Sequence, residues 1–228
     1  MRHALRTQPI PRRRLHAATT VPALTLALVF TMATVGLAKA PEPSPVPRTW
    51  QFDFDWEMPK LIELDTDDDG VIEFYWYMRY TVTNHTGADR LFVPHAQVLT
   101  DNGALITAGR GISTEVFDAI AARHGNPLLQ SPVDVIGKLL QGEDNARDSV
   151  VIWQPPAEDV NRMRLFFSGL SGDTATVPNP AHDPDADGDE PAELILRKTL
   201  VLDFKTPGGS IPVQRRPIKF ESQQWVMR

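Results

Sequence analysis

The sequence contains no cysteine. This absence excludes a disulfide framework, and it also excludes a lipid-modified cysteine as an anchor. A domain of this size can be stable without disulfides, because its core is large enough. The first forty residues also lack any acidic residue, although they hold six basic residues.

Beyond residue 40 the balance of charge is reversed. There, 17 basic and 29 acidic residues give a formal net charge of −12. Such a negative charge argues against nucleic acid or an anionic membrane surface as a partner. Membrane contact is expected only through the N-terminal segment, and only if that segment is not removed.

The N-terminal segment has the features of an export signal. Arg12–Arg14 precede Val21–Ala38, a run without charged residues, and small residues stand at its end. Two interpretations stay open, namely cleavage after Ala38 and an uncleaved membrane anchor formed by residues 21–38. Both predict an extracytoplasmic location, in the periplasm or cell envelope. We therefore divide the chain into residues 1–40 (signal or anchor), 41–48 (proline-rich linker) and 49–228 (one domain).

The strongest secondary-structure signal is a period of two. From Ile72 to Val82 apolar residues alternate with polar or amphipathic ones, which predicts a long, half-buried β-strand. Trp50–Trp56 shows the same alternation, and Leu61–Leu64 is expected to continue that strand after Pro59. Further strands are expected at Leu91–Leu99, Ser149–Trp153, Met163–Leu170 and Glu193–Phe204, with a turn at Thr100–Gly103.

The segment from about residue 112 to 140 has a different character. Thr114–Arg123 has helical spacing and is followed by Gly125, and Val133–Leu140 indicates a second short helix. We expect both helices to form an insertion over one end of the sandwich. The predicted fold class is mainly β, an Ig-like antiparallel β-sandwich with a short helical insertion.

Several segments resemble the Ig-like, telokin-like accessory domains of exported bacterial proteins, and the chain as a whole is similar to exported proteins of planctomycete type. The resemblance covers about residues 71–205 and implies a binding or assembly module without catalytic residues. The helical insertion departs from the minimal family pattern. The matching segments are Tyr80–Asn84, Thr100–Gly103, Val150–Trp153, Pro155–Asp159 and Met163–Phe167.

One acidic motif invites a catalytic hypothesis. Phe52–Glu57 (FDFDWE) resembles the acidic motif of chitinases, and a strand would bring Asp53, Asp55 and Glu57 onto one face. However, Trp50 occupies the place of that motif's first aspartate, and the chitinase barrel needs roughly 250 residues. A glycan-binding or glycan-cleaving protein is therefore the least favoured of our hypotheses.

Two acidic loops have the spacing of calcium ligands. Neither has the glutamate that closes such a loop, because Trp76 and Leu194 occupy its position. Weak Ca²⁺ binding is the only cofactor expected, and a Ca²⁺-dependent binding module is the alternative function. The candidate ligands are Asp65, Asp67 and Asp69 in the first loop and Asp183, Asp185 and Asp187 in the second.

No complete catalytic constellation is recognisable, and no pair of histidines has the spacing of zinc ligands. Tyr75, Tyr77 and Trp153 are either an exposed aromatic platform or, as we favour, part of the packing. The leading hypothesis is a non-enzymatic exported module that binds or scaffolds another envelope protein.

Overall fold

The computed structural model describes residues 41–66, 70–156, 159–182, 190–206 and 217–228. The chain divides into two units, Met1–Ala38 and Lys39–Arg228. The predicted signal or anchor lies outside the described residues. Within the described ranges, no helix has both the length and the apolar character needed to cross a membrane.

The first sheet is built around strand β3 (Glu73–Thr83). Strand β8 (Arg147–Trp153) pairs antiparallel along one edge of β3, and β1 (Asp53–Trp56) followed by β2 (Lys60–Leu64) pairs along the other. The edge is interrupted at Pro59, which has no N–H group to donate to a ladder hydrogen bond. The predicted continuation of the strand after this proline is confirmed.

The second sheet is built around the long strand β11 (Glu193–Lys205). Strand β12 (Lys219–Met227) pairs antiparallel with its C-terminal part, and β10 (Thr174–Pro178) pairs with its N-terminal part. Beyond β11 follow β9 (Arg162–Ser168), β5 (His95–Thr100) and β6 (Leu105–Thr107), each antiparallel to its neighbour.

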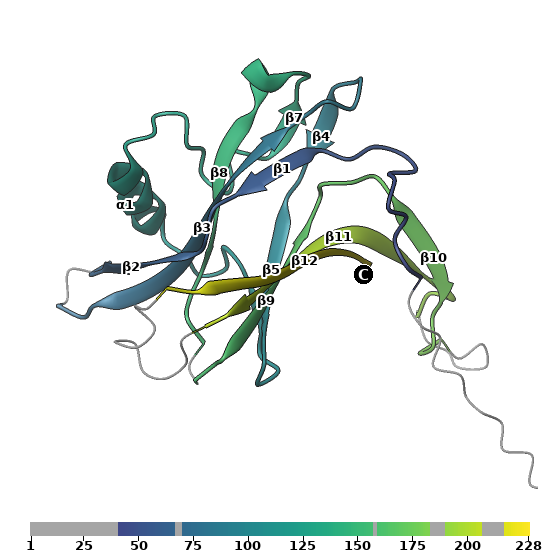
Figure 1. The fold of residues 1–228 in the computed structure, drawn as a ribbon. Coiled ribbons are helices and arrows are strands. Elements are labelled where there is room, and N and C mark those ends of the chain that lie inside the picture. The colour runs from purple at the N-terminus through teal and green to yellow at the C-terminus, as the bar shows by residue number, and fades with distance from the viewer. Residues whose placement is uncertain (1–40, 67–69, 157–158, 183–189, 207–216) are drawn as a thin grey trace, which may run out of the picture. The chain divides into compact units, whose positions relative to one another are not determined.

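The two sheets face each other across the main core (Figure 1). Alternate residues of β3, among them Trp76, Met78 and Tyr80, belong to the same buried cluster as Leu200 and Leu202 of β11. Alternation of this kind buries one face of each strand and explains why these segments form a sandwich. The predicted fold class, a mainly β antiparallel sandwich with a helical insertion, is confirmed.

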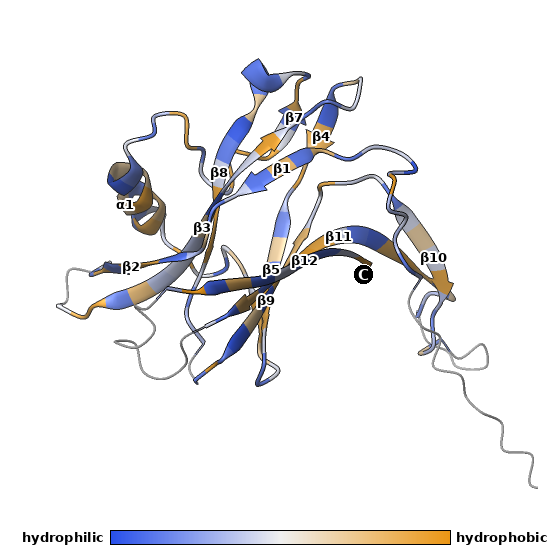
Figure 2. Ribbon diagram, in the orientation of Figure 1, coloured by the Kyte–Doolittle hydropathy of each residue, from blue (hydrophilic) through white to orange (hydrophobic). Residues whose placement is uncertain are grey.

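The predicted helix is present as α1 (Thr114–His124). It ends at Gly125, whose φ of 58° is left-handed and therefore suits glycine. Val116 and Ile120 on its apolar side are fully buried, and Figure 2 shows orange residues on the side of α1 that faces the first sheet. The helix therefore covers the outer face of that sheet, and the expectation that it covers one end of the sandwich is wrong.

Because of this helix, β3 is buried on both faces. Tyr75 and Tyr77 are 3% and 1% exposed and belong, with Val150 and Ile152, to a second buried cluster beneath α1. Trp153 is 1% exposed and lies in the main core. The prediction of a half-buried strand is wrong, whereas the favoured interpretation of these three aromatic residues, that they are part of the packing and not an exposed platform, is confirmed.

Two other expectations also need correction. Val133–Leu140 is a turn followed by strand β7 (Gly137–Leu139), which pairs with β4 (Arg90–Phe92) and so cannot be helical. The strand expected over Leu91–Leu99 is divided at Pro94 into β4 and β5, which pair in different sheets. A short 3₁₀ helix, Glu143–Asn145, precedes β8.

Candidate functional site

Most of the predicted calcium ligands lie outside the described residues, namely Asp67, Asp69, Asp183, Asp185 and Asp187. In the first loop, the Gly70 backbone N–H donates a hydrogen bond of 2.9 Å to Asp65 Oδ2, as in an acidic turn. Among the residues that the structure describes, no group of three or more His, Asp or Glu side chains is arranged to hold a metal ion. Calcium binding therefore stays a prediction.

Asp53 and Asp55 of the acidic motif lie on one exposed face of β1, as their spacing predicts, and Glu57 follows directly after the strand. Asp53 Oδ2 is 2.7 Å from His85 Nδ1, and Asp55 is exposed. Glu57 forms ion pairs with Arg79 and Lys60. The hydrogen bond from Arg79 lowers the pKa of the Glu57 carboxyl, whereas a general acid needs a raised pKa. The Glu57 carboxyl of the motif is thus part of surface ion pairs and is not suited to proton donation.

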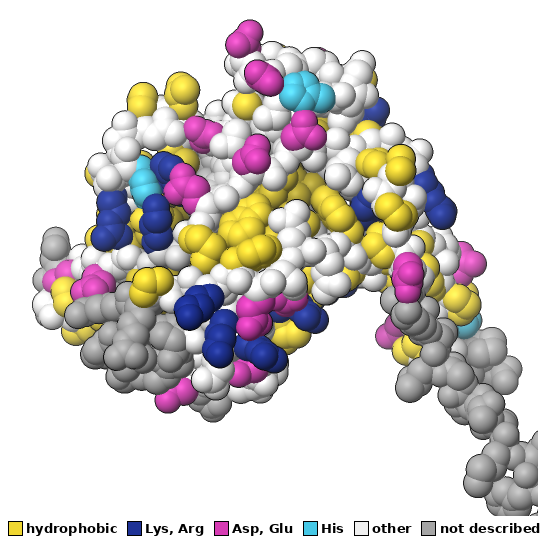
Figure 3. Space-filling model, in the orientation of Figure 1, with side chains coloured by type: hydrophobic (Ala, Val, Ile, Leu, Met, Phe, Trp, Pro, Cys, Tyr) yellow, Lys and Arg dark blue, Asp and Glu magenta, His cyan; other side chains and the backbone are white. Residues whose placement is uncertain are grey.

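The open side of the sandwich carries a different feature, an aromatic surface between the edge strands β1 and β12. Figure 3 shows hydrophobic side chains gathered in a hollow between these strands. Phe220 is 45% exposed, and the other aromatic residues of this surface are partly buried against the main core. We call it the aromatic cleft, and its residues are Phe54, Trp56, Phe220 and Trp225.

A β-bulge brings β12 into the correct register to contribute to this cleft. Leu202 pairs with Gln223, but the register shifts between Asp203 and Phe204, so that Phe204 pairs with Phe220. Without the shift, Glu221 would take the inward-facing position opposite Phe204. The bulge therefore places an aromatic ring in the cleft where the regular alternation would place a carboxylate.

Ring contacts hold the cleft in shape. The Trp56 ring lies 5.2 Å from the Phe220 ring, and its indole N–H donates to Gln223 Oε1 at 3.2 Å. Phe54 packs on the buried Phe167 at 4.6 Å. The contacts of Trp56 connect β1 to β12 across the opening, and the Phe54–Phe167 pair anchors β1 on β9 in the main core.

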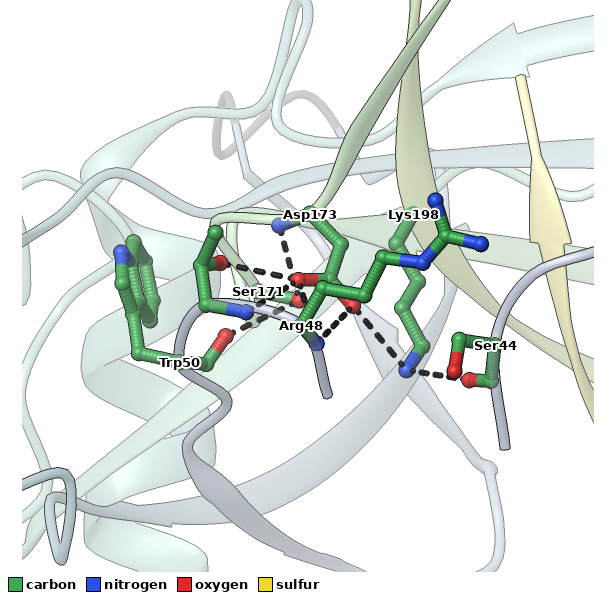
Figure 4. Close-up of polar contacts among 7 residues, drawn as sticks. Ser44, Arg48, Trp50, Ser171, Asp173 and Lys198 are labelled. Carbon is green, nitrogen blue, oxygen red and sulfur yellow. Dashed lines mark hydrogen bonds and ion pairs between the residues drawn. The ribbon is translucent and has the colours of Figure 1, made fainter. Parts of the chain in front are cut away.

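A buried ion pair, drawn in Figure 4, lies next to Trp225 of the cleft. Lys198 is 1% exposed, and its Nζ lies 3.6 Å from Asp173 Oδ2 and donates to the Ser44 carbonyl at 3.0 Å. The carboxylate of Asp173 accepts hydrogen bonds from the backbone N–H groups of Arg48 and Thr49 and from the Thr49 hydroxyl. Residues 41–48, predicted as a linker, are thus docked on the second sheet through this pair.

The same contacts position two tryptophans. The Ser171 hydroxyl and the Gly172 N–H both donate to the Trp50 carbonyl at 3.0 Å. Lys198 Nζ lies 5.2 Å from the centre of the Trp225 ring, a cation–π contact. A side chain at position 172 would overlap the Trp50 indole, so glycine is required there.

Electrostatics keep Asp173 ionised. Burial alone would raise the pKa of its carboxyl, but hydrogen bonds from Arg48 and Thr49, together with the charge of Lys198, lower it below its ordinary value. Asp173 is therefore ionised at neutral pH, and it lies beside Lys198 in a buried place.

No protein-family model, no curated protein and no solved structure matches this chain. The aromatic cleft and the buried pair therefore have to be interpreted from their own geometry.

Proposed function

We propose that this protein is a non-enzymatic, exported β-sandwich module that binds or scaffolds another protein of the cell envelope. The observation that carries the proposal is the aromatic cleft, which presents partly exposed rings between two edge strands. Aromatic residues, Phe included, are enriched at protein interfaces, and Trp is among the residues that most often dominate their binding energy.

The geometry favours a partner that binds as an extended segment. In the part of the chain that the structure describes, β12 pairs with β11 alone, so its second edge is available for main-chain hydrogen bonds. A strand added at such an edge places every second side chain on the same face. Those side chains would reach the aromatic cleft, which gives the interaction its apolar contribution.

The location proposed for this interaction is extracytoplasmic. The supporting features are the basic N-terminal segment and the uncharged run at residues 21–38, with cleavage and anchoring both still open. Docking of residues 41–48 on the second sheet keeps the start of the domain close to the aromatic cleft. A partner in the same compartment would meet the cleft directly.

The test uses the most exposed ring of the cleft. Phe220→Glu places a charge in the cleft, and Leu128→Glu is the matched control, because Leu128 is 74% exposed on a loop far along the chain from β12. Affinity purification from the native envelope should recover one dominant protein with the wild type and with Leu128→Glu, but not with Phe220→Glu. Equal recovery with both variants would contradict the proposal.

A further inference from the structure

A second cleft opens where the edge of the first sheet is interrupted between β1 and β2. It has a volume of about 590 Å³, and Pro59 lies in its wall. This volume is within the range of small-molecule sites, roughly 300–1,000 Å³. The missing N–H group of Pro59 prevents the edge strand from closing the gap, so the sequence itself creates the opening.

Basic side chains gather at this cleft. Lys60, Arg123 and His124 line it, and Arg79 lies close enough to His124 to act on its charge. Figure 3 shows Lys and Arg side chains grouped around a histidine beside the hydrophobic surface. The residues beyond 40 have a net charge of −12, so a cluster of positively charged side chains is unusual in this chain. It points to an anionic ligand.

Two carboxylates also lie near this cleft, but they do not neutralise the positive charge of its basic side chains. Glu57 is shared between Arg79 and Lys60, with its Oε2 3.2 Å from Lys60 Nζ, and Glu63 lines the cleft. Among the described residues, no carboxylate lies within ion-pair distance of Arg123. Its Nη1 donates to the Leu61 carbonyl at 3.0 Å, and a guanidinium has further N–H groups that can bind an acidic group.

Burial and the positive charges of Arg79, Lys60 and Arg123 lower the pKa of the His124 imidazole, and Glu57 opposes this shift. The ring is held by Tyr77, whose hydroxyl lies 2.9 Å from His124 Nε2. The positive charges of Arg79, Lys60 and Arg123 around this ring would attract a bound anion.

The rest of the cleft is apolar. Met58, Leu61 and Ile218 line the side turned toward the core, where Ile218 is 5% exposed. We propose that this cleft binds a small organic anion that joins one acidic group, a carboxylate or a phosphate, to an aliphatic chain. The acidic group contacts Arg123 and Lys60, and the chain lies along the apolar wall.

Calorimetric titration of the full chain with octanoate, octyl phosphate and 1-octanol tests this inference. At least one of the two anions should bind at least tenfold more tightly than the neutral alcohol. A preference for octanoate would assign a carboxylate ligand, and a preference for octyl phosphate would assign a phosphate ligand. Equal binding of all three compounds, or binding of neither anion, would overturn the inference.

A variant series locates the site. Arg123→Gln should weaken binding of the preferred anion about tenfold, the size expected for one charge-assisted hydrogen bond. Arg123 is exposed, so the fold should tolerate the change, and melting curves check this. Lys138→Gln is the matched control, since Lys138 is an exposed lysine on β7. Equal affinity in the two variants would place the anion elsewhere and overturn the inference.

Discussion

The buried pair of Lys198 and Asp173 leads to the prediction with the largest expected effect. Asp173→Asn keeps the shape of the side chain but removes its charge. It leaves the Lys198 ammonium, which is 1% exposed, with the Ser44 carbonyl and the Trp225 ring as its contacts. It also weakens the hydrogen bonds from Arg48 and Thr49, because bonds to a charged acceptor are the stronger ones.

The expected loss of unfolding free energy follows from the burial of this ion pair. Removing one partner of a buried ion pair costs about 3–5 kcal/mol of unfolding free energy. For a domain of this length, that loss corresponds to a fall in Tm of roughly 6–20 °C. Removing both charges with Lys198→Met in the same chain should restore part of this loss, because the second change removes the uncompensated charge.

Urea unfolding followed by tryptophan fluorescence measures the effect. Trp50 and Trp225 lie at the pair and report on it directly. Asp203→Asn is the matched control, because it breaks a more exposed ion pair, in which Asp203 Oδ1 lies 2.6 Å from Arg164 Nε. That control should cost no more than about 1 kcal/mol. If Asp173→Asn cost as little as the control, the docking of residues 41–48 through the pair would be refuted.

The Asp173 carboxylate also makes the free energy of unfolding depend on pH. The pKa of Asp173 is lower in the folded protein than its ordinary value of 3.8, so the folded state binds fewer protons than the unfolded state. The stability from Asp173 is therefore present above pH 3.8 and is lost as the pH falls below that value toward the folded pKa. Unfolding curves of Asp173→Asn should show a smaller acid-dependent loss than those of the wild type.

Three further predictions concern other parts of the domain. Gly169→Ala should cost at least about 1–3 kcal/mol in urea unfolding, because Gly169 has a φ of 93° and an added Cβ would overlap the Val93 carbonyl. An undiminished stability would contradict that geometry. Ile120→Ala should lower the free energy of unfolding by about 2–5 kcal/mol, because it removes a fully buried side chain between α1 and the first sheet. A loss below about 1 kcal/mol in the same urea unfolding would mean that the helix is not packed there. The pKa of His124 is lowered in the fold, so stability should fall as the pH drops below its ordinary value of 6.5, and His124→Gln should reduce that fall in pH-dependent melting; an unchanged fall would contradict it.

The strands whose alternation of apolar and polar residues is local and strong were predictable from the sequence. The alternation in Ile72–Val82 and in Glu193–Phe204 identified β3 and β11, which form the centres of the two sheets. The continuation after Pro59 was also predictable, because one proline removes one hydrogen bond without changing the alternation on either side. These predictions needed no information about distant parts of the chain.

The features missed by the sequence analysis depend on distant contacts. Tyr75 and Tyr77 look amphipathic, and only the packing of α1 over them makes the outer face of β3 a second core. Apolar and polar residues do not alternate regularly along β12, because its bulge shifts Phe220 to an inward-facing position. The helix predicted over Val133–Leu140 was wrong because β4 offers a strand partner to Gly137–Leu139, which local propensity does not reveal.

The candidate site was only partly predictable. The alternation of Trp50, Phe54 and Trp56 indicated an aromatic strand, but its contact with Phe220 comes from the other end of the chain. The sequence marks Lys198 as unusual, since it interrupts an otherwise apolar strand face. Nothing in the sequence marks its partner Asp173, because the carboxylate is held by backbone groups more than one hundred residues earlier in the chain.

Site-specific photo-cross-linking tests the central claim, that the aromatic cleft binds an extended segment of an envelope protein. A benzophenone amino acid at position 220 replaces an exposed ring of the cleft, and the same group at Asp118, exposed on α1, serves as the comparison. We expect position 220 alone to form a cross-link to one envelope protein, within a segment of alternating apolar residues. Cross-links of equal yield from both positions, or none from position 220, would contradict it.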